Sequence, residues 1–151
     1  MLGPEFEAVR QLVIKGQDVN TSGALVATLL PAYGLNDQFS NTPLAPVIVS
    51  ISYVVRGANW AQNVVLTLTE KLLSNGNTVK STTVTLPAQS VGRGGMVILP
   101  NEFQPRVDSY VEITVTTTAN AAGAAADLAI NYVMSPEVLP LVRQAISDSP
   151  V

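Results

Sequence analysis

The sequence predicts an all-β fold, a single antiparallel β-sandwich with about eight strands by the signals that mark strands and turns. Apolar and polar residues alternate with period two over much of the chain, as in strands with one buried face. Val, Ile, Thr and Tyr are enriched in those stretches, and turn residues recur at intervals of roughly 8 to 12 residues. The pattern does not separate a jelly roll from an immunoglobulin-like sandwich.

A chain of 151 residues fits one domain, here residues 1–151. At this length roughly 68 to 70% of the unfolded surface can be buried, so the fold needs no disulfide or metal. No internal repeat or long linker divides the chain. Residues 1–5 are expected to be disordered or to derive from a cloning tag.

Three strands have the clearest alternation. They are predicted at Val47–Val55, Val107–Thr117 and Asp127–Met134. Odd positions form the apolar face of the first two strands, and even positions form that of the third. Each is therefore expected to bury one face in the core.

A hairpin is predicted over Val64–Leu86, with its turn at Asn75 and Gly76. A two-residue loop would place core residues opposite polar ones, whereas a three-residue loop over Asn75–Asn77 keeps one face apolar. The expected register places Leu66 opposite Leu86 and Leu68 opposite Val84.

The remaining segments complete the sandwich. Less regular strands are expected at residues 6–15 and 24–30, and a short buried strand at Met96–Leu99. Residues 31–46 are predicted to be a long loop because they are rich in Pro, Asn and Asp, and residues 118–126 are predicted to connect two strands.

The C-terminus alone has a helical pattern, over residues 136–148. Ser135 suits the N-cap and Pro136 the first helical position. Leu139, Val142 and Ile146 then recur at helical spacing, while Val138 and Leu141 point to other sides. This apolar excess predicts that the segment contacts another chain.

Composition narrows the functional classes. The net charge of −3 and eight scattered Lys and Arg residues argue against binding nucleic acid. No apolar run reaches the about 18 residues of a membrane-spanning helix, and no signal peptide is recognisable at the start. Charged residues make up 13% of the chain, about half of the roughly 25% that is typical. The low charge predicts a surface partly covered by partners, although a plainly uncharged surface is the alternative.

Catalytic chemistry has no support in the sequence. The chain contains no His and no Cys, which removes the commonest general base and zinc ligands. The acidic residues show no spacing typical of a metal loop or an acid/base pair, and solvated strand faces explain them. We therefore expect no enzyme, catalytic residue, metal or cofactor.

Two further positions are candidates for contacts. The glycine-rich residues 92–95 precede a strand, not a helix, which favours a turn over a phosphate loop. Arg93 within it is a candidate contact between subunits. Trp60 is expected in the core or as an interface anchor. The full set of predicted interface residues is Trp60, Arg93, Val138, Leu139, Leu141, Val142 and Ile146.

A small acidic β-sandwich without Cys or His, rich in Val, Thr, Ala and Asn and ending in the apolar segment 136–146, resembles the capsid decoration (cement) proteins and small jelly-roll coat proteins of bacterial viruses. The resemblance implies a homo-oligomer, often a trimer, that sits on the major capsid protein in the virion after assembly in the host cytoplasm. No motif matches position by position, so it transfers no site residue.

Two other classes remain open. A carbohydrate- or receptor-binding module, such as a fibre or lectin-like domain, would have its groove near Trp60 or the loop 31–46. A hydrolase on a β-sandwich is disfavoured by the missing His and Cys.

Overall fold

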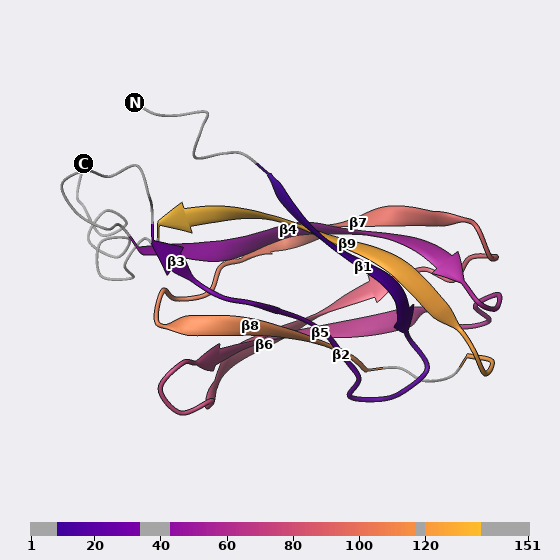
Figure 1. Ribbon diagram of the computed structural model, residues 1–151, viewed down its shortest axis with the longest axis horizontal. Helices are drawn as coiled ribbons and strands as arrows, with labels where there is room; N and C mark the ends of the chain where they lie inside the picture. Colours follow the sequence, from indigo (N-terminus) through magenta and orange to yellow (C-terminus); the bar gives the residue numbers. More distant parts are fainter. Residues whose placement is uncertain (1–8, 34–42, 117–119, 137–151) are drawn as a thin grey trace, which may run out of the picture.

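A computed structural model of the chain describes residues 9–33, 43–116 and 120–136. Two β-sheets pack face to face, with the core between them (Figure 1). The strands are β1 (Arg10–Asp18), β2 (Leu25–Leu29), β3 (Ala32–Tyr33), β4 (Pro43–Arg56), β5 (Val64–Leu72), β6 (Thr78–Leu86), β7 (Gly94–Phe103), β8 (Ser109–Val115) and β9 (Ala125–Pro136).

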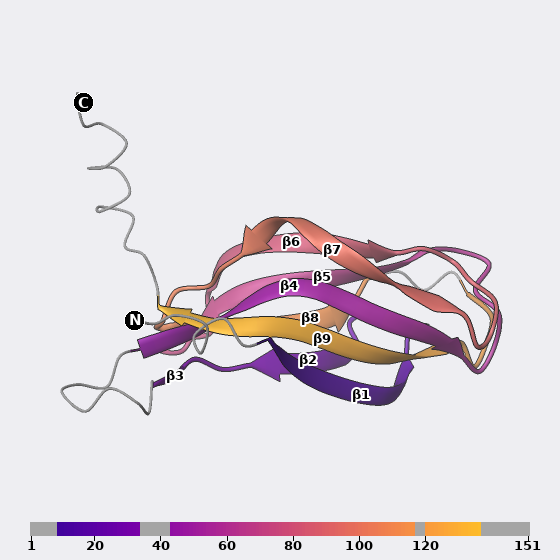
Figure 2. The same cartoon turned by 90° about the horizontal axis from the view of Figure 1, so that it is seen from above.

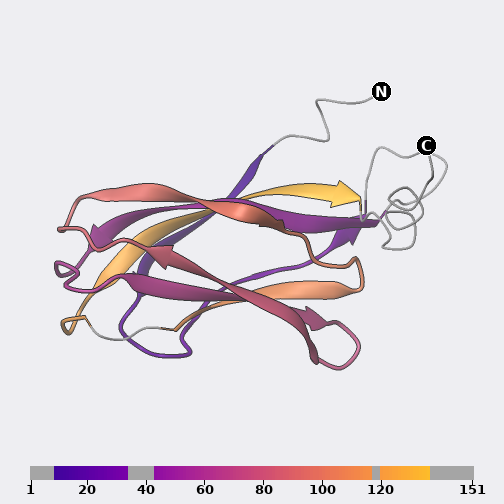
Figure 3. The same cartoon turned by 180° about the vertical axis from the view of Figure 1, so that it is seen from behind.

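The strands form a five-stranded and a four-stranded sheet, and every pairing is antiparallel. In the first sheet the order is β1-β9-β4-β3, and β7 also pairs with β4. The second sheet has the order β2-β8-β5-β6. Figure 2 shows the sandwich from above, where the two sheets overlap, and Figure 3 shows the two layers from behind. The predicted all-β antiparallel sandwich is confirmed, and no helix occurs within the described ranges.

Side chains from both sheets fill the core as the alternation predicts. On β8 the odd positions are buried, and on β9 the even positions Leu128 and Ile130 are buried. The largest fully buried side chains include Ile48, Ile51, Leu66, Leu68, Leu86, Ile113, Leu128 and Ile130. Burial of such residues is the main force that holds the two sheets together.

A bulge changes the alternation within β4. The odd positions Ile51, Tyr53 and Val55 are in the core as predicted, but upstream of the bulge Ile48 takes the core position. The register shifts between Ile48 and Ser50, so Val49 is the extra residue and is only half-buried. An inserted residue moves all earlier side chains to the opposite face, so the prediction that Val47 and Val49 share the core face with Ile51 is wrong.

The hairpin of β5 and β6 has a different register from the predicted one. Leu66 pairs with Val84, not with Leu86, and Leu68 pairs with Thr82. The turn is longer than three residues, because β5 ends at Leu72 and the register shifts after Glu70. The shift is two residues, so the predicted apolar face is preserved.

Positive φ at Gly76 in the turn agrees with the sequence signal. The φ angle of Gly76 is +75°, and its N–H donates to the carbonyl of Leu72 at 2.8 Å. The N–H of Leu72 donates to the carbonyl of Asn77 at 2.9 Å. These two bonds close the end of the hairpin.

Both ends of the predicted loop 31–46 belong to strands, since Ala32 and Tyr33 form β3 and residues from Pro43 onward form β4. At the other end of the chain, β9 continues through Ser135 and Pro136, where the sequence predicted the start of a helix. Both residues pair with β4 and are extended, so the helix does not begin there. The rest of the predicted helix, residues 137–148, and residues 1–5 lie outside the described residues.

Candidate functional site

The five-stranded sheet has one face that points away from the core, which we call the outer face. Cross-strand pairing places its central residues in two rows over β1, β9, β4 and β7. The first row is Gln11, Asn131, Ser50 and Ile98, and the second is Val13, Ala129, Ser52 and Met96. None of these eight side chains is charged.

Hydrogen bonds connect the polar residues in the centre of the outer face. The side-chain amide of Gln11 donates to Oδ1 of Asn131 at 2.9 Å. Nδ2 of Asn131 donates to the hydroxyls of Ser50 at 3.0 Å and Ser52 at 3.2 Å. Asn131 and Ser50 are buried although they lie on this face. The centre is therefore a surface of small side chains whose polar atoms bind one another.

Exposed apolar side chains lie on both sides of this polar centre. Val13 on β1 is 52% exposed, and Met96 and Ile98 on β7 are 59% and 67% exposed. Covering apolar surface is favourable by about 25 cal/mol per Å². A partner laid across the sheet would thus gain free energy at both borders without separating a charge from water.

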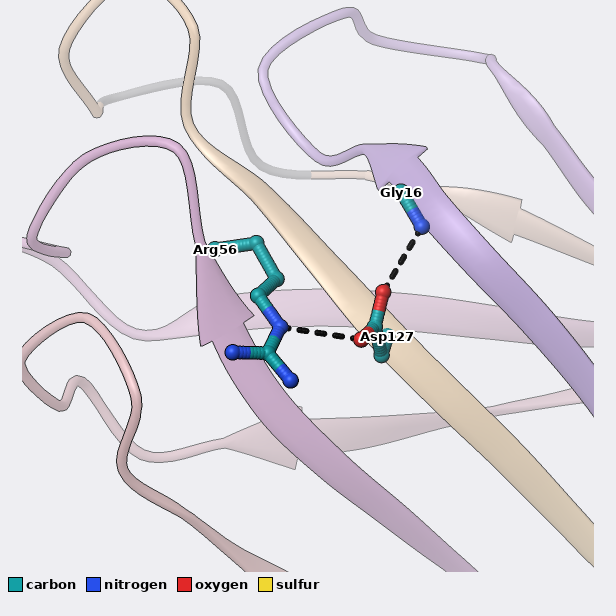
Figure 4. Close-up of polar contacts among 3 residues, drawn as sticks. All are labelled: Gly16, Arg56 and Asp127. Atoms are coloured by element: carbon teal, nitrogen blue, oxygen red, sulfur yellow. Dashed lines mark hydrogen bonds and ion pairs between the residues drawn. The ribbon is translucent and has the colours of Figure 1, made fainter.

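Charged side chains lie at one end of the outer face, around Asp127 on β9. One carboxylate oxygen accepts the N–H of Gly16 at 2.9 Å, and the other accepts Nε–H of Arg56 at 2.9 Å (Figure 4). The hydrogen bond from Gly16 is the main cause that lowers the pKa of Asp127, followed by that from Arg56. Gly16 lies where the β1 register shifts and has a φ of +63°. Asp127 on β9 therefore forms hydrogen bonds to β1, at its register shift, and to β4.

Glu70 is a polar core residue that sequence reasoning missed. Its side chain is 1% exposed, and Oε2 accepts the N–H of Arg106 at 2.8 Å. Nζ of Lys80 lies 3.8 Å from Oε1 and donates to the carbonyl of Gln104 at 2.7 Å. The acidic residues were expected on solvated faces. This prediction is correct for Asp108 and Glu112 but wrong for Glu70. The even positions Val64, Leu66 and Leu68 could have placed it in the core.

Trp60 is in the core, the first of the two predicted roles. Its side chain is 5% exposed and its ring stacks on that of Tyr53, with centroids 5.4 Å apart. Burial raises the pKa of Tyr53, whose hydroxyl donates to the carbonyl of Pro87 at 2.6 Å. A ring enclosed in this way is not available to stack on a sugar.

Arg93 is exposed in the turn before β7. Its N–H donates to the carbonyl of Ser90 at 3.0 Å, and Gly92 has a φ of +88°. The turn predicted over residues 92–95 is confirmed only in its first part, because Gly94 and Gly95 already belong to β7. The other predicted interface residues, Val138, Leu139, Leu141, Val142 and Ile146, lie outside the described residues.

Within residues 9–33, 43–116 and 120–136, no group of three or more acidic side chains is arranged to hold a metal ion. The same ranges contain no helix that is long and apolar enough to cross a membrane.

No protein-family model and no curated protein matches this chain. Among solved structures, the chain is similar to the solution structure of CtCBM11, a carbohydrate-binding module. The sequences are 12% identical, the TM-score is 0.42, and the match covers 85% of this chain and 90% of that one. Similarity at this level does not bear on what the present chain binds.

Proposed function

We propose that the protein is a non-enzymatic structural subunit, and that it assembles with other protein subunits through the outer face of its five-stranded sheet. The observation that carries the proposal is the pattern of that face. Exposed Val13, Met96 and Ile98 border a centre of small side chains without charges. Large exposed apolar side chains around an uncharged surface favour contact with another protein.

The composition of the chain supports the same proposal. A charged fraction of 13% leaves few charges to keep an isolated subunit dispersed. The specific form that we propose is a decoration or minor coat protein bound to the major capsid protein of a virion lattice. This form rests on the resemblance in composition and size.

Sedimentation velocity of the full chain tests assembly. We expect a species heavier than the 15.9 kDa chain, with a share that grows with concentration. A double variant, Val13→Lys with Ile98→Lys, is expected to shift the protein toward monomer because it places charges at both borders of the outer face. Val79→Lys is the matched control, since Val79 is 40% exposed on β6 of the other sheet.

Two outcomes would overturn the proposal. One is a wild-type protein that remains monomeric at every concentration and binds no capsid particle. The other is a double variant that assembles like wild type. A glycan-binding screen on the same samples distinguishes the alternative class, because a carbohydrate-binding module would bind a sugar as a monomer.

A further inference from the structure

The outermost strands of a sheet expose N–H and C=O groups that can pair with another chain. Folded proteins usually protect such edges with charged side chains, bulges or very short strands. In this sandwich, β1, β7 and the two-residue β3 are edge strands of the five-stranded sheet, and β2 and β6 are those of the four-stranded sheet. The four longer edge strands, β1, β2, β6 and β7, differ in their protection.

Three of these edges have recognisable protection. β1 carries Lys15 and Asp18 and a register shift between Ile14 and Gln17. β2 has only five residues and its own register shift. β6 carries Lys80, whose ammonium is directed toward buried Glu70 at 3.8 Å. A strand added to β6 would bury that charge further, which is unfavourable.

β7 lacks these devices over Gly94–Leu99. The segment contains no charged residue and no proline, and its register with β4 is regular from Gly94 to Ile98. Met96 and Ile98 are its outward side chains and are more than half exposed. This edge has the features of a strand that accepts another strand.

The turn before β7 determines which backbone groups face its open edge. The N–H of Val55 donates to the carbonyl of Arg93 at 2.8 Å, so Arg93 bonds toward β4. Bonding direction alternates along an antiparallel strand, so Gly95 and Val97 also bond toward β4. The N–H and C=O groups of Gly94, Met96 and Ile98 consequently point to the open edge.

We infer that β7 pairs in antiparallel fashion with β7 of a second copy of the chain, about a two-fold axis at Val97. In this register Met96 of each copy lies opposite Ile98 of the other, and the two residues of each pair exchange backbone hydrogen bonds. Their side chains form two apolar cross-strand pairs on the outer face. The inference rests on the proposed function and specifies one partner and one edge for it.

A second copy fits this edge better than an unrelated strand, because the segment complements itself. An uncharged strand places no like charges opposite each other when it is related to its copy by a two-fold axis. Each exposed side chain finds an apolar partner, and a two-fold contact closes on itself. The five-stranded sheets of the two copies become continuous across the axis.

Disulfide trapping tests the register. The chain has no cysteine, so Val97→Cys introduces a single thiol at the proposed axis, next to its counterpart. Under mild oxidation we expect a disulfide-linked dimer of twice 15.9 kDa. Val79→Cys is the control, because Val79 lies on β6 of the other sheet and is 40% exposed, whereas Val97 is half-buried, so random collisions favour the control. Cross-linking of Val97→Cys no faster than that of Val79→Cys would contradict the pairing.

Sedimentation equilibrium of single variants separates this inference from the proposed function. Ile98→Lys is expected to raise the dimer dissociation constant about tenfold, while Val79→Lys, on β6 of the other sheet, leaves it unchanged. Circular dichroism checks that the variants are folded, which we expect because the substituted side chains are exposed. If wild type assembles but Ile98→Lys has the same dimer dissociation constant, the edge pairing is wrong and the proposed structural role stands. The same conclusion follows if Val97→Cys cross-links to a different protein and not to its own copy. If wild type is monomeric throughout, both fail.

Discussion

At the scale of single residues, the carboxylate of Asp127 connects three strands of one sheet. It accepts hydrogen bonds from Gly16 on β1 and from Arg56 at the end of β4. Asp127→Ala removes both acceptors and is expected to lower the melting temperature. Asp108→Asn is the control, because the ion pair of Asp108 with Arg106 is more than half exposed and worth little. Equal melting temperatures for Asp127→Ala and wild type would contradict this role.

The same contacts predict how stability depends on pH. They lower the pKa of Asp127 in the folded state below the ordinary value of 3.8. The stabilising effect is therefore complete well above pH 3.8 and is lost as the pH falls through the lower, folded-state pKa. We expect the difference in melting temperature between wild type and Asp127→Asn to shrink below pH 3.8. A difference that stays constant down to pH 2 would show that the charge of Asp127 does not act in this way.

Glu70 gives the second prediction at this scale. Glu70→Ala leaves the N–H of Arg106 without its acceptor and Lys80 without its nearby carboxylate. Loss of a hydrogen bond at a buried side chain costs about 1 to 3 kcal/mol, and we expect a loss of this size in the free energy of unfolding measured with urea. Glu70→Gln retains an oxygen acceptor and should cost less.

Glu112→Ala provides the comparison. Its ion pair with Lys71 is 2.9 Å long, but both side chains are 27% exposed, so its removal should cost less than about 1 kcal/mol. If Glu70→Ala is no more destabilising than Glu112→Ala, burial of Glu70 has no energetic importance.

At the scale of elements, two adjacent glycines show how closely β7 approaches β4. A Cβ on Gly94 would lie 1.7 Å from the carbonyl oxygen of Tyr53, whereas one on Gly95 would meet the Tyr53 ring at an ordinary 3.6 Å. Gly94→Ala must therefore displace backbone and is expected to lower the melting temperature strongly. Gly95→Ala should be tolerated, which makes it a matched control in the same strand. Equal melting temperatures for the two variants would contradict this close packing.

The strands themselves could be predicted because alternation is a local property of the sequence. Val111 and Ile113 on β8 face the core as expected, as do Leu128 and Ile130 on β9. The bulge at Val49 could not be predicted, since one extra residue appears only when β4 pairs with β9 and β7. The prediction of the β5–β6 register was wrong for a similar reason, because the register shift after Glu70 lengthens the turn.

At the scale of the whole molecule, the candidate site depends on pairing between distant segments. Met96 and Ile98 were expected in a short buried strand, but both are exposed because β7 lies at the edge of the sheet. Ser50 and Asn131 are 81 residues apart in the chain and become hydrogen-bonded only through the β4–β9 pairing. Strand order is set by the tertiary fold, so the outer face could not be assembled from periodicity alone.

The apolar C-terminal residues lead to a prediction about assembly. Deletion of residues 137–151 leaves β9 intact, because that strand ends at Pro136. We expect the truncated chain to remain a folded β-sandwich with a lower oligomeric state, because Val138, Leu139, Leu141, Val142 and Ile146 are removed. Circular dichroism and sedimentation velocity check the two parts. Normal assembly of the truncated chain would contradict a contact role for these residues.

The side-chain hydrogen bonds in the centre of the outer face all run in the same direction across the sheet. Gln11 donates to Asn131, and Asn131 donates to Ser50 and Ser52, so every bond is oriented from β1 toward β4. Each serine hydroxyl accepts from Asn131 and keeps its own hydrogen to donate. Ser50 is buried, so a subunit that lies across β4 would meet the donor of Ser52, and the complementary surface would supply an oxygen acceptor such as a backbone carbonyl. Both borders of the face attract apolar groups, whereas the polarity of its centre would fix the orientation in which a partner binds.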